Sequence, residues 1–213
     1  MADIRLFEPQ DIEALYEISL ATGHRGGDAS HLFIDPRMMG HIYAAPYALL
    51  EPALALVVED QGRRLGFAVG TLDTSLWETK LERDWWPQLR MRYADPADVP
   101  ASERNADQMR AFFIHHPAAT PVSVRQRYPA HLHLNLLSEL QGQGWGRRLF
   151  AAWVAHAKSQ GAGAMHVLVN RANERAIGFW ASLGFVKLAF DDAKDERRLW
   201  MGRPAAEEFT LGR

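Results

Sequence analysis

The chain has 213 residues, a length that fits one large domain or one domain with a sizeable insertion. Its hydrophobic fraction of 47% supplies enough side chains for a core, and the absence of cysteine excludes disulfides, thiolate metal sites and cysteine nucleophiles. The formal net charge of -2 gives no general reason to expect nucleic acid as a partner. The sequence contains neither an apolar run long enough to span a membrane nor a signal-peptide pattern at its start. We therefore expect a single cytoplasmic domain over residues 1–213, with no membrane or nucleic-acid partner.

The first third of the chain predicts a strand, a helix and a hairpin. Residues 3–7 alternate between polar and apolar, and the apolar residues of 11–22 recur close to helical spacing. After a glycine-rich break, two apolar runs at 53–60 and 65–73 are joined by a short turn that contains Gly62. Two such runs around a short glycine turn are typical of an antiparallel hairpin.

Residues 75–130 contain no strand pattern of this kind; they show stretches of helical pattern and seven large aromatic residues. The segment is too long for a simple loop, so we predict a partly helical insertion. Aromatic residues at helical spacing usually serve packing, and we interpret most of them as a small core of the insertion itself. The alternative is that some of them line a ligand cleft.

The last third of the chain predicts alternating strands and helices. Its elements are a strand at 131–137, a helix at 145–160, a strand at 164–169, a helix at 173–183 that Gly184 ends, and late strands at 185–190 and 197–202. Strand, helix, strand and helix in this order imply a parallel pair at the centre of a mixed sheet. The fold class is therefore α/β with a mixed sheet.

A glycine turn, QGQGWG at 141–146, joins the strand at 131–137 to its helix. Such a turn presents backbone amides and the positive end of a helix dipole to an anion, and missing side chains let a phosphate approach the main chain. No Lys-Ser or Lys-Thr follows, which excludes a P-loop, and the third glycine of the dinucleotide fingerprint is missing. A purely structural turn is the remaining alternative.

Gln141, Gly144 and Gly146 resemble motif A of the GNAT-type N-acetyltransferases, written (Arg/Gln)-x-x-Gly-x-(Gly/Ala). Downstream, NERAIGFWASLGF resembles the second motif of that family, Asn-x-x-Ala-x-x-Phe-Tyr-x-x-x-Gly-Phe. Its matching positions are Asn173, Ala176, Phe179, Gly184 and Phe185. Two motifs in the order of the family, separated by one strand, favour membership over a chance turn.

The resemblance implies a fold, a cofactor and a site. The fold is a mixed, mostly antiparallel twisted sheet with splayed central parallel strands flanked by helices, here with the long helical insertion before the fourth strand. The cofactor is acetyl-CoA, whose pantetheine arm lies between the splayed strands, and no metal is implied. The residues expected to bind it are Leu136, Gln141, Gly142, Gln143, Gly144, Trp145, Gly146, Arg147, Asn173 and Trp180. Acceptor pockets of the family are built from variable segments, here 23–47 and 75–130.

A narrower resemblance covers residues 35–203. The segment G-x-I-Y-A-x-P-Y at 40–47, the strand end GTLD at 70–73 and a Trp-x-Pro helix at 85–87 are similar to the acetyltransferase-like C-terminal domain of O-GlcNAcase and its stand-alone bacterial relatives. In the animal enzyme the glycine loop is degraded, and that domain is regarded as a pseudo-acetyltransferase. Because this sequence keeps the loop, we expect it to keep the cofactor. The chain has no glycosidase domain, so sugar hydrolysis is not expected.

Two residues are candidates for the general base of acetyl transfer, His133 and Asp73. His133 shares one strand face with His131 and Asn135, and its ordinary pKa lies near neutrality, but a structural histidine is an equal alternative. Asp73 ends a strand, a place that commonly lines the site in such sheets, and there it either acts as a base or binds a cationic substrate. Tyr43 and Tyr47 are further candidates to reach the site, and packing is an equal alternative for Tyr47, which follows Pro46. The histidine pairs lack a third ligand at a metal-site spacing, so we reject a metal.

Trp180 occupies the position at which many members of the family carry a tyrosine that acts as the acid. An indole can donate a hydrogen bond but does not usefully supply a proton, so this departure concerns catalysis and not binding. The sequence thus predicts an acetyl-CoA-dependent N-acetyltransferase for an unidentified amine. The alternative is a pseudo-acetyltransferase that binds acetyl-CoA and acts as a sensor or interaction module.

Overall fold

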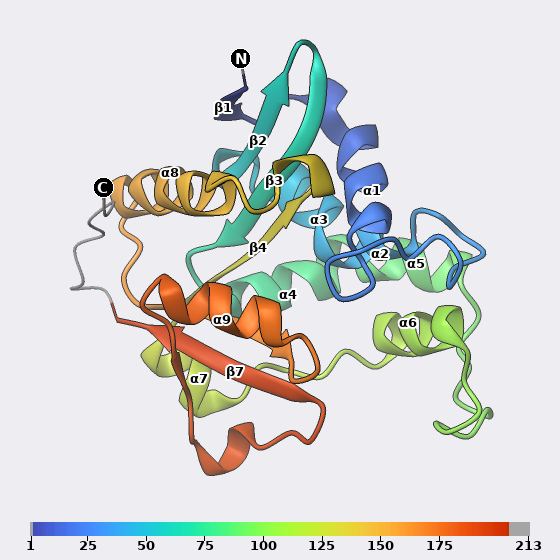
Figure 1. The fold of residues 1–213 in the computed structure, drawn as a ribbon. Helices are drawn as coiled ribbons and strands as arrows, with labels where there is room; N and C mark the ends of the chain where they lie inside the picture. The colour runs from blue at the N-terminus through green and yellow to red at the C-terminus, as the bar shows by residue number, and fades with distance from the viewer. Residues whose placement is uncertain (1, 205–213) are drawn as a thin grey trace.

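Seven strands form one mixed sheet in the order β1-β2-β3-β4-β5-β7-β6 in the computed structural model, which describes residues 2–204 (Figure 1). The pairs β1–β2, β2–β3 and β3–β4 are antiparallel, β4 and β5 run parallel, and the pairs β5–β7 and β7–β6 are again antiparallel. This arrangement confirms the predicted fold class and the central parallel pair. The strands are β1 (Asp3–Leu6), β2 (Ala55–Asp60), β3 (Arg63–Thr71), β4 (Ala130–Leu136), β5 (Met165–Asn170), β6 (Val186–Lys187) and β7 (Arg198–Arg203).

Helices cover both faces of this sheet (Figure 1). None of those within residues 2–204 is long and apolar enough to cross a bilayer. They are α1 (Ile12–Ala21), α2 (Met38–Tyr43), α3 (Ala45–Leu50), α4 (Thr74–Asp84), α5 (Trp86–Arg92), α6 (Ala106–His115), α7 (Val122–Arg127), α8 (Trp145–Ser159) and α9 (Glu174–Ser182).

The predicted hairpin is β2 and β3, joined by Gln61 and Gly62. Both turn residues have positive φ, 49° and 78°, which is the conformation of a two-residue hairpin turn that matches the twist of its strands. Glycine suits the second of these positions because it lacks the Cβ that disfavours positive φ.

The helical insertion is present as α4 to α7, but its aromatic residues pack differently from our interpretation. Trp77, Trp85 and Trp86 are buried in one cluster with Phe67 and Val69 of β3 and with side chains of α1 to α3. They extend the core on one face of the sheet and do not form a separate core. The helix predicted through this region breaks at Trp85, because Pro87 in the first turn of α5 cannot donate a backbone hydrogen bond to a continuing helix.

Alternation along the strands divides the core between the two faces of the sheet. Leu132 and Leu136 of β4 join α8 and Trp180 of α9 on one face. His131, His133 and Asn135 point to the opposite face, which α1 to α4 cover, because successive strand residues face opposite ways. The polar side of β4 thus lies beneath the helices that precede it in the chain.

The first of the two late strands is shorter than the pattern predicted, whereas the second, β7, has the predicted length. Gly184, with φ of 86°, ends α9 as expected. Strand β6 then comprises Val186 and Lys187, and the chain leaves the sheet before a short 3-10 helix at Asp191–Ala193.

Candidate cofactor and acceptor site

Strands β4 and β5 separate soon after they meet. Within the described chain their pairing is confined to Ala130 with Met165 and His131 with His166. The amide of Leu137 donates to the carbonyl of Leu65 on β3 at 2.9 Å, so odd-numbered backbone groups of this strand face β3. The backbone groups of Leu134 and Leu136 therefore face the gap toward β5. This is the splayed parallel pair that the sequence predicted.

The three glycines of the turn serve two purposes. Gly142 and Gly144 have φ of 75° and 79°, and a Cβ at either position would meet no atom within 4 Å. Their left-handed backbone requires glycine, and the space beside them is open. Gly146 is different, because a Cβ there would lie 2.9 Å from the Phe179 ring of α9. Gly146 is therefore needed for close packing of α8 against α9.

The two glutamines of the turn hold its backbone in place. The Gln141 side chain donates to the carbonyl of Leu136 at 2.7 Å and to that of Gly26 at 3.3 Å. The Gln143 side chain donates to the carbonyl of Glu139 at 2.6 Å. Gln141 thus connects the end of β4, the turn and the loop after α1.

Helix α8 begins at this turn without the capping side chain or acidic residue that usually stabilises a helix N-terminus. Gly144 is the N-cap, no side chain caps the helix, and its first turn contains no acidic residue. The amides of Trp145 and Gly146 lack intrahelical acceptors, as in any first turn. Two arginines follow instead: Arg147 contacts the Ser182 carbonyl at 3.3 Å, and Arg148 lies 5.1 Å from the Trp145 ring. Such a helix start favours a bound anion.

The second motif forms α9 and its N-terminal cap. The Asn173 side chain accepts a hydrogen bond from the Ala176 amide at 3.0 Å, which explains asparagine at this position. Trp180 is 7% exposed, and its ring packs against Phe150, Phe179 and Phe185 at centroid distances of 5.9, 5.1 and 5.0 Å. The structure thus gives Trp180 a role in packing, and its contact with the cofactor stays a prediction.

The polar face of β4 borders a pocket of about 140 Å³. The pocket lies between the end of α1, helix α2 and β4. The Asn135 side chain donates to the Thr22 hydroxyl at 2.6 Å across it, and the Tyr43 ring lies 5.6 Å from that of His133. Its lining residues are Ser19, Thr22, Gly23, Met39, Tyr43, His133 and Asn135, none of which is charged at neutral pH.

Tyr47 lies between the two histidines of β4. Its hydroxyl is 2.7 Å from Nε2 of His131 and 3.3 Å from Nε2 of His133, and its ring stacks on Trp77 at 4.3 Å. The ring of His166 on β5 lies 5.3 Å from that of His131. Burial lowers the pKa of His133 and that of His166 to about 4. These imidazoles are therefore neutral at pH 7.

Asp73, the other predicted base, begins helix α4. Its carboxylate accepts hydrogen bonds from the amides of Ser75 and Leu76 at 2.8 and 3.0 Å. These contacts identify it as the N-cap of this helix. Its role in catalysis remains a prediction.

Sequence reasoning missed Thr22, Thr74 and His166, which the fold brings to this site. The register of β4 against β5 pairs His166 with His131. A correct alignment of these two predicted strands would have placed His166 at the site. Thr74 lies next to the predicted Asp73 but had no pattern of its own. Within residues 2–204 no group of three or more His, Asp or Glu side chains could hold a metal ion.

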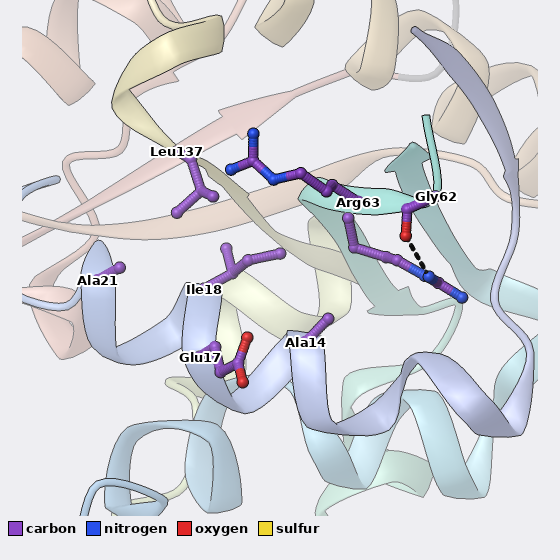
Figure 2. A pocket seen from close by; sticks show the side chains of 8 residues that line it. Ala14, Glu17, Ile18, Ala21, Gly62, Arg63 and Leu137 are labelled. Carbon is purple, nitrogen blue, oxygen red and sulfur yellow. Dashed lines mark hydrogen bonds between the residues drawn. The ribbon is translucent and has the colours of Figure 1, made fainter. Parts of the chain in front are cut away.

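A second pocket, of about 390 Å³, lies between α1 and the β2–β3 turn (Figure 2). Leu137, the residue that follows β4, also lines it. Its two arginines are already paired. Arg64 donates to the Gly62 carbonyl and the Asp11 carboxylate, and Arg63 donates to Glu139. The pocket therefore offers no unpaired cation to a ligand.

The structure is therefore an α/β protein in which two splayed parallel strands lie beside a glycine turn that begins a helix. The sequence profile of the Acetyltransferase (GNAT) family matches residues 27–185, about three quarters of the chain. The chain belongs to this family.

The resemblance to O-GlcNAcase is also confirmed, although it is weak. Rat Protein O-GlcNAcase is 21% identical over 187 residues, which are 87% of this chain and 20% of that protein. The chain thus spans about a fifth of the length of this curated relative.

Solved structures share the fold of this chain. SsHAT is 33% identical, with a TM-score of 0.87 over 97% of this chain and 99% of that one. YncA from Salmonella typhimurium, solved with its cofactor acetyl-CoA, is 20% identical, with a TM-score of 0.53 over 99% of this chain and 98% of that one. At that identity the likeness to YncA shows the fold alone.

Proposed function

We propose that the chain binds acetyl-CoA and transfers its acetyl group to the amine of an acceptor not yet identified. One observation carries this proposal: the gap between β4 and β5 leads to a helix start with glycine as its N-cap, no capping side chain and no acidic residue in its first turn. Family membership and the acetyl-CoA bound by YncA, a protein of the same fold, support it.

The turn supplies the cofactor site in this proposal. The amides of Gly144, Trp145 and Gly146 would donate to the diphosphate, and Arg147 would add positive charge. The backbone groups of Leu134 and Leu136 that face the gap would pair with the amides of the pantetheine arm. Acetyl-CoA, when bound there, supplies an activated acetyl thioester.

The pocket on the polar face of β4 is the proposed acceptor site. Acetyl transfer requires an amine that loses its proton as it attacks, and a neutral imidazole can accept that proton. His133 lines the pocket and its pKa of about 4 keeps it neutral at pH 7. We assign the base role to His133, because the Asp73 carboxylate already accepts two amide hydrogen bonds.

The second candidate function is that of a pseudo-acetyltransferase that binds acetyl-CoA without turnover. Trp180 favours it, because this position of the second motif holds a buried indole in place of the usual tyrosine. Both functions use the same cofactor site and differ in catalysis.

Calorimetry with acetyl-CoA tests the cofactor site that the two functions share. An assay of CoA thiol release over a panel of amines, amino-terminal peptides and aminoglycosides then separates them. Release above background hydrolysis with any acceptor supports the transferase. Tight binding with no such release supports the pseudoenzyme.

A further inference from the structure

We propose that Thr74, His131 and Tyr47 are positioning residues that hold His133 in one tautomer, with a proton on Nε2 and the lone pair of Nδ1 available in the acceptor pocket. This inference deepens the proposed function and rests on it. The three residues come from α4, β4 and α3, so the fold and not the local sequence assembles them.

The carbonyl of Pro129 determines which groups donate and which accept in this series of hydrogen bonds. The Thr74 hydroxyl lies 2.7 Å from the Pro129 carbonyl oxygen, which can accept a hydrogen bond and cannot donate one. Two oxygens at this distance require the hydroxyl hydrogen between them. The same hydroxyl lies 2.7 Å from Nδ1 of His131. Because its hydrogen is already used, Thr74 must accept a hydrogen bond from that nitrogen.

Tyr47 connects His131 to His133, so the protonation of His131 determines which nitrogen of His133 donates. Burial lowers the pKa of His131 well below its ordinary value, so a ring protonated on Nδ1 has a lone pair on Nε2. The Tyr47 hydroxyl, 2.7 Å away, therefore donates to His131. Its oxygen is then free to accept from Nε2 of His133 at 3.3 Å. Nδ1 of His133 carries the lone pair and has no hydrogen-bond partner among residues 2–204.

His166 is oriented in the same way by the neighbouring carbonyl. Its Nδ1 lies 2.6 Å from the carbonyl oxygen of Tyr128, so it donates there. Two consecutive carbonyls, those of Tyr128 and Pro129, thus set the proton positions of the two imidazoles that pair across β4 and β5. The reverse arrangement at His131 would leave the Thr74 and Pro129 oxygens 2.7 Å apart with no hydrogen between them.

Nitrogen-15 NMR of the histidine-labelled 213-residue protein measures the tautomer directly. We expect His133 to carry its proton on Nε2 in the wild type and in Thr74→Ser, which keeps the hydroxyl. Tyr47→Phe keeps the ring that stacks on Trp77 but removes the hydroxyl, and Thr74→Val removes the hydroxyl of the first link. In both we expect a mixture of tautomers, and kcat about tenfold lower with the KM for acetyl-CoA unchanged, because only proton acceptance is affected.

A proton on Nδ1 of His133 in the wild type would overturn the inference. So would Tyr47→Phe with an unchanged tautomer, or with an unchanged kcat in an active enzyme. Thr74→Ser must behave like the wild type, since loss in this variant would indicate a packing role. If no amine is acetylated, the proposed function fails, but the tautomers of the wild type, Tyr47→Phe and Thr74→Val still decide the inference.

Discussion

Gly144 combines a left-handed backbone, open space where a side chain would lie, and the start of α8. We expect Gly144→Asp to lower acetyl-CoA affinity at least tenfold, because the new carboxylate would occupy the place of the diphosphate and repel it. The backbone strain should cost about 1 kcal/mol of stability. Calorimetry gives the affinity, and urea unfolding gives the stability.

Gly62→Asp is the matched control for this change. Gly62 has φ of 78° and the same open surroundings, but it lies in the β2–β3 turn. We expect a similar loss of stability with unchanged affinity for acetyl-CoA. Equal affinity losses in the two variants would show that strain, and not the position of the turn, governs binding.

Trp180 packs in the core at the position where many members of the family carry a tyrosine. We expect Trp180→Ala to lose about 3–5 kcal/mol of unfolding free energy, because it empties the space among three aromatic rings. Trp180→Phe should lose clearly less, since it keeps a ring in contact with Phe150 and Phe185. Equal and small losses in urea unfolding would contradict a packing role.

At the scale of elements, substitutions of Asp73 distinguish a helix-capping carboxylate from a general base. Asp73→Ala should cost about 1 kcal/mol of stability, because two amides of α4 lose their acceptor. Asp73→Asn keeps an acceptor oxygen and should keep both stability and acetyl transfer. A stable Asp73→Asn protein without turnover would return the base role to Asp73.

The elements themselves follow from local patterns. Positive φ at Gln61 and Gly62 makes the hairpin, and Gly184 ends α9, as the sequence predicted. Pro87, whose effect on the helix was not predicted, divides it into α4 and α5. Local patterns could not predict which residues pack against Trp77 and Trp86, because their partners on β3 and α1 to α3 are distant in the sequence. Aromatic spacing predicts that a residue is buried, but not which surface buries it.

At the scale of the whole molecule, buried neutral histidines make stability depend on pH. The pKa of His41, His133 and His166 falls to about 4 in the folded chain from an ordinary value of 6.5, so the unfolded chain binds protons more readily between these values. Stability should be fully present above pH 6.5 and should fall as the pH drops toward 4. A shift of this size at buried His166 corresponds to about 3 kcal/mol.

Urea unfolding at pH 7, 6 and 5 measures this dependence. His41→Gln, which removes a buried imidazole outside the acceptor pocket, should show a shallower fall than the wild type. Stability that stays constant or rises on acidification would contradict neutral burial of these rings.

The site could be predicted from the sequence only in part. The turn at 141–146 is a continuous segment whose glycines and flanking pattern are visible in the chain, and the structure places it beside the gap between β4 and β5. The hydrogen-bond chain from Thr74 through Tyr47 to His133 joins α4, α3 and β4. Its members meet only because the sheet register and helix packing bring them together.

A crystal structure of the protein grown with acetyl-CoA shows directly whether the cofactor lies between β4 and β5 and on the glycine turn. We expect the diphosphate on the amides of Gly144 to Gly146 and the pantetheine arm along Leu134 and Leu136. An empty gap between β4 and β5 at saturating acetyl-CoA, or a cofactor bound elsewhere, would contradict it.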